Sequence, residues 1–198
     1  NTGGMGAYSP APVVTPEIHA RAMREVILPT VLGMKADGIP YTGFLYAGLM
    51  INPDGQIKTL EFNCRMGDPE TQPIMARLES DLVDTLDKAI DGKLDEVELK
   101  WDRRIALGVV MAAHQYPDTP RTGDVIQGIP NPTDDQIVFH AGTKLQDGNL
   151  ITSGGRVLCV VGLADTVKAA QQKAYSAIKQ IHFDGMQYRN DIGFRAIK

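Results

Sequence analysis

The sequence is poor in cysteine. Its 198 residues include two, Cys64 and Cys159, which lie far apart and form no metal-type spacing. A disulfide framework is therefore excluded, and the chain is expected in a reducing compartment. Its length is sufficient to bury a hydrophobic core in one large domain or two small ones.

Long hydrophobic runs and an excess of positive charge are missing as well. The longest apolar runs, such as residues 157–161, have the length of a strand and fall far short of a membrane span. No basic-then-apolar leader opens the chain. The formal net charge of −4 gives no general attraction to nucleic acid or to an anionic membrane. We expect a soluble, cytoplasmic protein with neither of these partners, in which local cations receive anionic substrates.

An initiator methionine is also absent, because residues 1–6 read NTGGMG. A natural domain rarely begins inside a glycine-rich loop, so we expect the chain to be a fragment of a longer protein.

The first half of the chain is predicted to contain helices and one hairpin. Thr15 before Pro16 predicts a helix start, and the apolar spacing continues to Lys35 with a kink or restart at Pro29. The predicted strands of the hairpin are 42–51 and 57–63, and an amphipathic helix follows with Ser80 as its N-cap.

The second half is rich in predicted strands. They cover residues 104–112, 124–127, 136–141 and 156–162, and a final helix covers 166–181. Antiparallel strands with helices packed to one side indicate the α+β class. The charged stretch 91–102 has little apolar pattern, so we expect two domains, residues 1–98 and residues 99–198.

The strand at 57–63 carries the most informative side chains. Because alternate residues of a strand share a face, Leu60 and Phe62 are expected to point into a core, while Glu61 and Asn63 project together from the other face. A carboxylate beside an amide oxygen suits a hard cation such as Mg²⁺. Arg65 follows closely enough to hold a carboxylate or a phosphoryl oxygen. On spacing alone, an exposed strand face with Arg65 paired to one of these residues is the simpler interpretation.

The longer string around this strand resembles a known family. Residues 60–72 read LEFNCRMGDPETQ, and the Glu-x-Asn pair with a following Arg is similar to the last metal-binding strand of ATP-grasp ligases. The whole string resembles the version in glycinamide ribonucleotide synthetases. Further segments agree in order: 1–10 (NTGGMGAYSP), 41–48 (YTGFLYAG), 140–143 (HAGT) with 154–158 (GGRVL), and 188–193 (YRNDIG). The resemblance spans essentially the whole chain.

The resemblance implies a fold and a reaction. The fold would be the C-terminal half of an ATP-grasp domain, followed by a small antiparallel β domain with a helix like that of biotin carboxylase. The reaction would join glycine to 5-phosphoribosylamine through glycyl phosphate, with ATP as co-substrate and Mg²⁺ (or Mn²⁺) as cofactor, in purine biosynthesis. The nucleotide-binding lysines would lie in a missing N-terminal half, so the fragment alone is expected to be inactive.

The resemblance also assigns residues to roles. Glu61 and Asn63 would hold the metal, and Arg65 would be catalytic. The expected substrate contacts are Asn1, Thr2, Gly3, Gly4, Asp68, Pro69, Glu70 and Arg156. Of these, Arg156 would hold the ribose phosphate. Many ATP-grasp enzymes carry a second acidic metal ligand on the first hairpin strand, but residues 44–46 offer no acid.

Two alternatives stay open at this point. One is another ATP-grasp carboxylate–amine ligase, although the string at residues 67–72 argues against it. The other is a non-catalytic module that retains the fold for interaction, which the joint presence of Glu61, Asn63 and Arg65 disfavours.

Overall fold

The protein forms two compact units, each built from segments that are separated in the sequence. The structure is a computed structural model and describes residues 3–197. Unit 1 comprises Asn1–Pro10, Asp68–Leu78 and Asp102–Lys198, and unit 2 comprises Ala11–Gly67 and Glu79–Trp101. The predicted boundary between residues 98 and 99 divides the chain into two successive domains, whereas each unit combines separate segments. That boundary stays a prediction.

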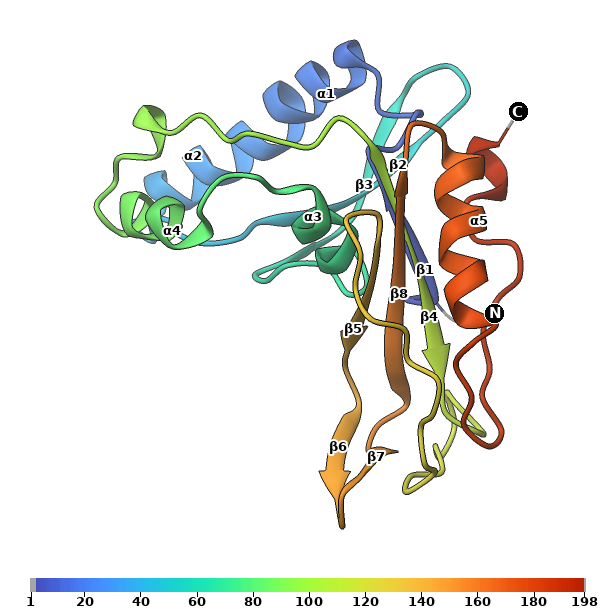
Figure 1. Cartoon of the computed structure of the whole chain (residues 1–198). Helices are drawn as coiled ribbons and strands as arrows, with labels where there is room; N and C mark the ends of the chain where they lie inside the picture. Colours follow the sequence, from blue (N-terminus) through green and yellow to red (C-terminus); the bar gives the residue numbers. More distant parts are fainter. Residues whose placement is uncertain (1–2, 198) are drawn as a thin grey trace. The chain divides into compact units, whose positions relative to one another are not determined.

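Unit 1 is organised around one antiparallel sheet (Figure 1). Its strand order is β1-β4-β8-β5, with β1 at Gly6–Ser9, β4 at Ile105–Ala112, β8 at Arg156–Ala164 and β5 at Gln136–His140. The two central strands are apolar along most of their length and almost completely buried. Such continuous apolar strands are typical of a sheet that is covered on both faces.

Different helices cover the two faces of this sheet. Helix α5 (Val167–Ile178) packs its alanines against the face that carries Leu107 and Val109. Helix α3 (Thr71–Arg77) contributes Ala76 to the opposite face. The expectation that helices pack to one side is therefore wrong for unit 1, because the alternating side chains of β4 are apolar on both faces.

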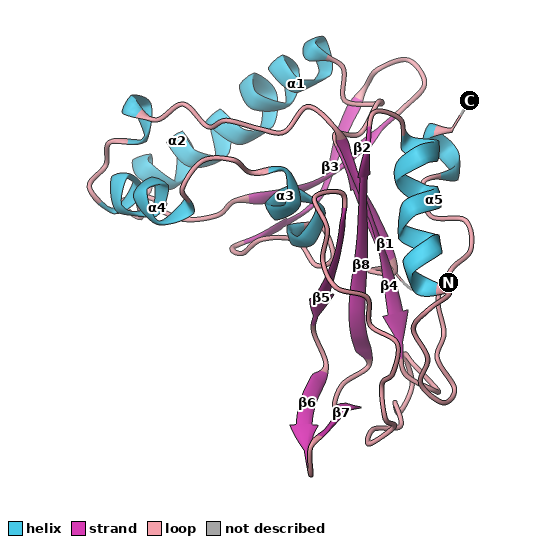
Figure 2. Cartoon of the chain, viewed as in Figure 1, coloured by secondary structure: helices cyan, strands magenta, loops and turns pink. Residues whose placement is uncertain are grey.

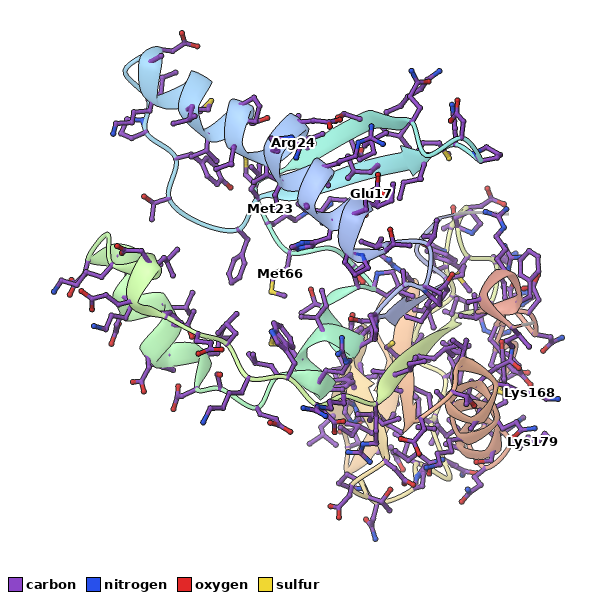
Figure 3. All side chains as sticks on the ribbon, turned by 90° about the horizontal axis from the view of Figure 1, so that it is seen from above. Glu17, Met23, Arg24, Met66, Lys168 and Lys179 are labelled. Atoms are coloured by element: carbon purple, nitrogen blue, oxygen red, sulfur yellow. The ribbon has the colours of Figure 1, made fainter. Side chains whose placement is uncertain are left out.

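The outer surface of α5 is polar. Lys168 and Lys179 are exposed and point away from the sheet (Figure 3). By contrast, Cys159 lies in the sheet core beside α3, where burial raises the pKa of its thiol to about 12. Cys159 is thus a neutral core side chain rather than a reactive one.

Shorter elements complete unit 1. The hairpin β6 (Thr143–Gln146) and β7 (Asn149–Thr152) was not predicted, and neither was β1. The strand expected at 124–127 is reduced to isolated bridges at Val125 and Gln127. A short 3₁₀ turn, Phe194–Ala196, lies near the end of the described chain.

Unit 2 contains one long interrupted helix, a hairpin and a shorter helix (Figure 2). The first runs as α1 (Pro16–Ala22), a π-helical segment (Met23–Ile27) and α2 (Leu28–Ala36), and Thr15 caps its start by accepting a hydrogen bond from the Ile18 amide. The π segment lies directly before the turn that contains Pro29, whose missing N–H and ring disturb regular α-helical bonding.

The other elements of unit 2 are close to those predicted. The hairpin pairs β2 (Tyr46–Ile51) with β3 (Ile57–Asn63). Helix α4 (Leu82–Ile90) is capped by Asp81 rather than by Ser80, whose hydroxyl accepts from the Lys100 amide instead. A short 3₁₀ turn, Leu94–Glu96, follows.

Unit 2 buries little apolar surface. Among its described residues only Ile18 is a buried hydrophobic side chain, while Leu60 and Phe62 are 64% and 42% exposed. The prediction that Leu60 and Phe62 enter a core is wrong for this structure, because no other element of unit 2 covers them. In residues 3–197, no helix combines the length and apolar character that crossing a membrane requires.

A substitution at Gly162 can test how closely α5 packs on the sheet. A Cβ at this position would lie 2.4 Å from the Ala170 carbonyl oxygen and 2.7 Å from the Ala174 amide nitrogen. Since α5 must move to admit it, Gly162→Ala should lower the free energy of unfolding by about 2–3 kcal/mol in urea titrations followed by circular dichroism.

The matched control is Gly33→Ala, which adds a methyl group with no neighbour within 4 Å in helix α2. It should leave stability unchanged or raise it slightly. A Gly162→Ala protein as stable as the original would show that α5 does not approach β8 this closely.

Candidate functional site

Strand β3 brings Glu61 and Asn63 together at its end. The Asn63 Nδ2 donates a hydrogen bond of 3.1 Å to Glu61 Oε1, so the predicted adjacency of these two side chains is confirmed. Gly48 faces Glu61 across the hairpin, and a Cβ at Gly48 would lie 3.1 Å from Glu61 Cγ. The glycine therefore leaves room for the glutamate side chain.

The oxygen atoms of this pair could supply some, but not all, of the ligands of a hard cation. Because Asn63 uses its amide nitrogen toward Glu61, its Oδ1 and the second carboxylate oxygen of Glu61 have no hydrogen-bond donor among residues 3–197. Carboxylate and amide oxygens are ligands that Mg²⁺ accepts, together with water and phosphate oxygens. The described residues contain no group of three or more His, Cys, Asp or Glu that could hold a metal ion. Glu61 and Asn63 would thus supply only part of a coordination shell.

Arg65 lies exposed just beyond β3. Its Nη1 donates to the Met66 carbonyl oxygen at 2.9 Å, and the described chain shows no ion pair between Arg65 and Glu61. The simpler interpretation, in which Arg65 neutralises its strand neighbour, is therefore not what the structure shows. Most of the guanidinium N–H groups stay available to an anionic ligand.

Tyr41 is a neighbour of this segment that sequence reasoning missed. Its hydroxyl donates to the Phe44 carbonyl oxygen at 2.5 Å. Desolvation, followed by the Cys64 thiol as hydrogen-bond and charge partner, raises the pKa of Tyr41. No local pattern marks this contact, because the hairpin brings together residues 23 positions apart.

A second group of predicted residues meets within unit 1, around Arg156. Its Nη2 donates to Asp68 Oδ2 at 2.8 Å, and its Nη1 donates to the carbonyl oxygens of Asp68 and Gly4 at 2.9 and 3.3 Å. Arg156 therefore joins the start of β8 to two loops. Gly4 has φ +78°, and a Cβ there would lie 2.4 Å from Arg156 Nη1, so glycine is required at this contact.

The remaining predicted substrate contacts differ in their surroundings. Pro69 is buried, and Glu70 lies at the N-cap position of α3 without a side-chain cap bond. Gly3 is exposed with open space around it. Asn1 and Thr2 lie outside the described residues.

Gln72, in the first turn of α3, is a further residue that the sequence did not single out. Its Oε1 is buried and has no hydrogen-bond partner in the described part of the chain. A buried acceptor without a donor costs free energy, so such groups are uncommon in folded proteins.

Two family models match the chain, and curated relatives match its whole length. The phosphoribosylglycinamide synthetase ATP-grasp (A) domain matches residues 1–71, and the phosphoribosylglycinamide synthetase C domain matches residues 106–195. The phosphoribosylamine–glycine ligases of Ralstonia nicotianae and Vibrio parahaemolyticus are 76% and 64% identical over 198 residues. These alignments cover 100% of this chain but 47% and 46% of the relatives, so the chain spans about half their length.

Solved structures also match the chain. The crystal structure of phosphoribosylamine–glycine ligase from Thermotoga maritima matches 97% of this chain and 47% of that chain, with a TM-score of 0.83 and 38% identity. A biotin carboxylase from Campylobacter jejuni matches 94% of this chain and 41% of its own, with a TM-score of 0.66, but at 15% identity it shows the fold alone. The α+β fold class is confirmed, and the two family models together account for most of the chain, which belongs to the phosphoribosylglycinamide synthetase family.

Proposed function

We propose that the protein containing this chain is a phosphoribosylamine–glycine ligase, which joins glycine to 5-phosphoribosylamine and converts ATP to ADP and phosphate. The observation that carries the proposal is the Glu61–Asn63 pair on β3, in a chain 76% identical to a relative that bears this name. Because the chain spans about half of that relative, we further propose that it acts only when joined to the rest of its protein. We also propose a cytoplasmic location, because two free cysteines suit a reducing compartment.

The proposed reaction has two steps. A carboxylate oxygen of glycine attacks the γ-phosphorus of ATP, ADP leaves, and glycyl phosphate forms. The amine nitrogen of phosphoribosylamine then attacks the glycyl carbonyl carbon, and phosphate leaves with the former carboxylate oxygen. Such phosphoryl transfer depends on positioning and charge neutralisation more than on covalent help from the protein.

The residues of β3 suit the first step. Glu61 and Asn63 would hold Mg²⁺ (or Mn²⁺), which supplies charge neutralisation at phosphate oxygens when bound. Arg65, with most of its N–H groups unbonded, would hold the acyl phosphate as its charge develops.

The residues of unit 1 are suited to position the substrates. Gly3 and Gly4 allow a close backbone approach, and Arg156 holds the loop that begins at Asp68 through hydrogen bonds to Asp68 itself. We propose that Asn1 and Thr2, which lie outside the described residues, also contact the substrate. Glycyl phosphate is hydrolysed readily, so water must be excluded during the second step. Glu61 and Arg65 are exposed, and we propose that the remainder of the protein covers them.

Removing the Glu61 carboxylate should abolish turnover without unfolding the protein. In the full-length protein, Glu61→Ala should lower kcat for glycine-dependent ADP release at least about a hundredfold, or roughly 2.7 kcal/mol. Asn63→Ala should do the same less severely, because an amide oxygen contributes less to Mg²⁺ binding than a carboxylate. Glu17→Gln is the matched control, since Glu17 is an exposed acid on helix α1 of the same unit (Figure 3). Near-normal activity of Glu61→Ala at saturating Mg²⁺ would contradict the assignment.

Arg156 is proposed to hold the phosphate of phosphoribosylamine. A guanidinium contact with a partly desolvated phosphate contributes about 2–3 kcal/mol, so Arg156→Ala should raise the KM for phosphoribosylamine about thirty- to a hundredfold. The KM values for glycine and ATP should change little, because the phosphate is remote from the reacting nitrogen.

The control for this variant is Arg121→Ala, in which another partly exposed arginine of unit 1 loses its ion pairs with Asp124 and Asp184. A comparable rise in the KM for glycine and phosphoribosylamine together would show that Arg156 acts by holding the Asp68 loop. No change in either KM would remove Arg156 from the substrate site.

A further inference from the structure

Unit 1 contains a hollow that no sequence motif indicated. Its volume is about 210 Å³, and its wall includes Met5, Ala112, Tyr116, Gln187, Tyr188 and Arg189. We call it the tyrosine hollow. All of its lining residues belong to one compact unit.

The tyrosine hollow adjoins Arg156 through three separate connections. Ala112 is the cross-strand partner of Arg156 at the end of β4. Met5 follows Gly4, whose carbonyl oxygen accepts a hydrogen bond from Arg156. The ring of Tyr116 lies against Gly155, the residue before Arg156. The hollow and the guanidinium are therefore neighbouring features of one site.

The walls of the tyrosine hollow are held in place by backbone contacts. A Cβ at Gly155 would lie 2.5 Å from Tyr116 Cδ2, so the glycine is what admits the tyrosine ring. Gln187 exchanges two backbone hydrogen bonds with Ala112, and its Nε2 donates to the Ala113 carbonyl oxygen at 3.0 Å. A ligand would therefore meet a preformed surface, which lowers the entropic cost of binding.

The free groups of the hollow are neutral hydrogen-bonding groups. Within residues 3–197, no hydrogen-bond partner is found for the hydroxyls of Tyr116 and Tyr188 or for the Gln187 side-chain oxygen. Arg189 is neutralised by Asp191, with contacts of 2.8 and 2.6 Å. Hydroxyl and amide groups beside aromatic rings suit a sugar better than an anion.

Arg156 brings a positive charge next to the hollow and forms an ion pair of 2.8 Å with Asp68. A guanidinium carries five N–H donors, and three hydrogen bonds connect Arg156 to Gly4 and Asp68. The other N–H groups can reach a phosphate while the existing contacts keep the side chain oriented.

We propose that the tyrosine hollow receives the pentose of a pentose 5-phosphate, whose phosphate is held by Arg156. The proposal rests on the proposed function for the identity of the ligand, phosphoribosylamine. Tyr116 and Tyr188 then act as substrate-binding residues through hydrogen bonds to the sugar hydroxyls.

Tyrosine-to-phenylalanine variants test this role, because they remove a hydroxyl and keep the ring. In the full-length protein, Tyr116→Phe and Tyr188→Phe should each raise the KM for phosphoribosylamine about three- to tenfold, the loss expected for one neutral hydrogen bond. The KM values for glycine and ATP and the melting temperature should stay unchanged. Tyr8→Phe is the matched control, since Tyr8 is a half-buried tyrosine of unit 1 that does not line this hollow.

The outcomes separate this inference from the proposed function. If both variants match the original protein while Arg156→Ala still raises the KM for phosphoribosylamine, the pentose lies elsewhere and the inference is overturned. If the original protein forms no ADP with all three substrates, the proposed function fails. Calorimetry with ribose 5-phosphate then decides the inference alone: binding weakened by both variants supports it, and absent or unaffected binding overturns it.

Discussion

The antiparallel pairing of β4 with β8 is the contact on which unit 1 depends. Both strands are almost wholly apolar, so the sheet needs cover on both faces, which α5 and α3 provide. Because the strands are antiparallel, the end of β4 lies beside the start of β8. That geometry places Arg156 next to Ala112 and next to the loop that leads into α3. The polar groups of unit 1 therefore gather at one end of a rigid apolar frame.

Unit 2 presents the opposite situation, since its candidate metal ligands lie on a hairpin that buries little. A two-stranded hairpin is marginally stable by itself in water. Leu60 and Phe62 flank Glu61 and are exposed, as are several apolar residues of α2 and α4. Under the proposed function, the apolar side chains need cover and the metal ligands need protection from water. If the rest of the protein covers this hairpin, it would meet both needs at once.

Local patterns predicted the features whose causes are local. The alternation of side chains along a strand predicted that Glu61 lies beside Asn63, and the Thr15–Pro16 pair predicted the start of the first helix. The same alternation could not show whether any element covers Leu60. Strand β1 was missed because its four residues carry no strand pattern of their own and pair with β4, which is distant in the sequence. The contact between Asp68 and Arg156 joins residues 88 positions apart, so nothing in either segment reveals it. The tyrosine hollow was missed for the same reason.

The central claim is that glycine is activated as glycyl phosphate. Glycine labelled with ¹⁸O in its carboxylate tests it directly, because the oxygen that attacks the γ-phosphorus must leave with that phosphorus in the second step. Mass spectrometry of the phosphate released by the full-length protein should show one ¹⁸O atom per phosphate, in unlabelled water with ATP and phosphoribosylamine. Phosphate that carries no label, with the second ¹⁸O atom lost to water when the amide forms, would contradict the account.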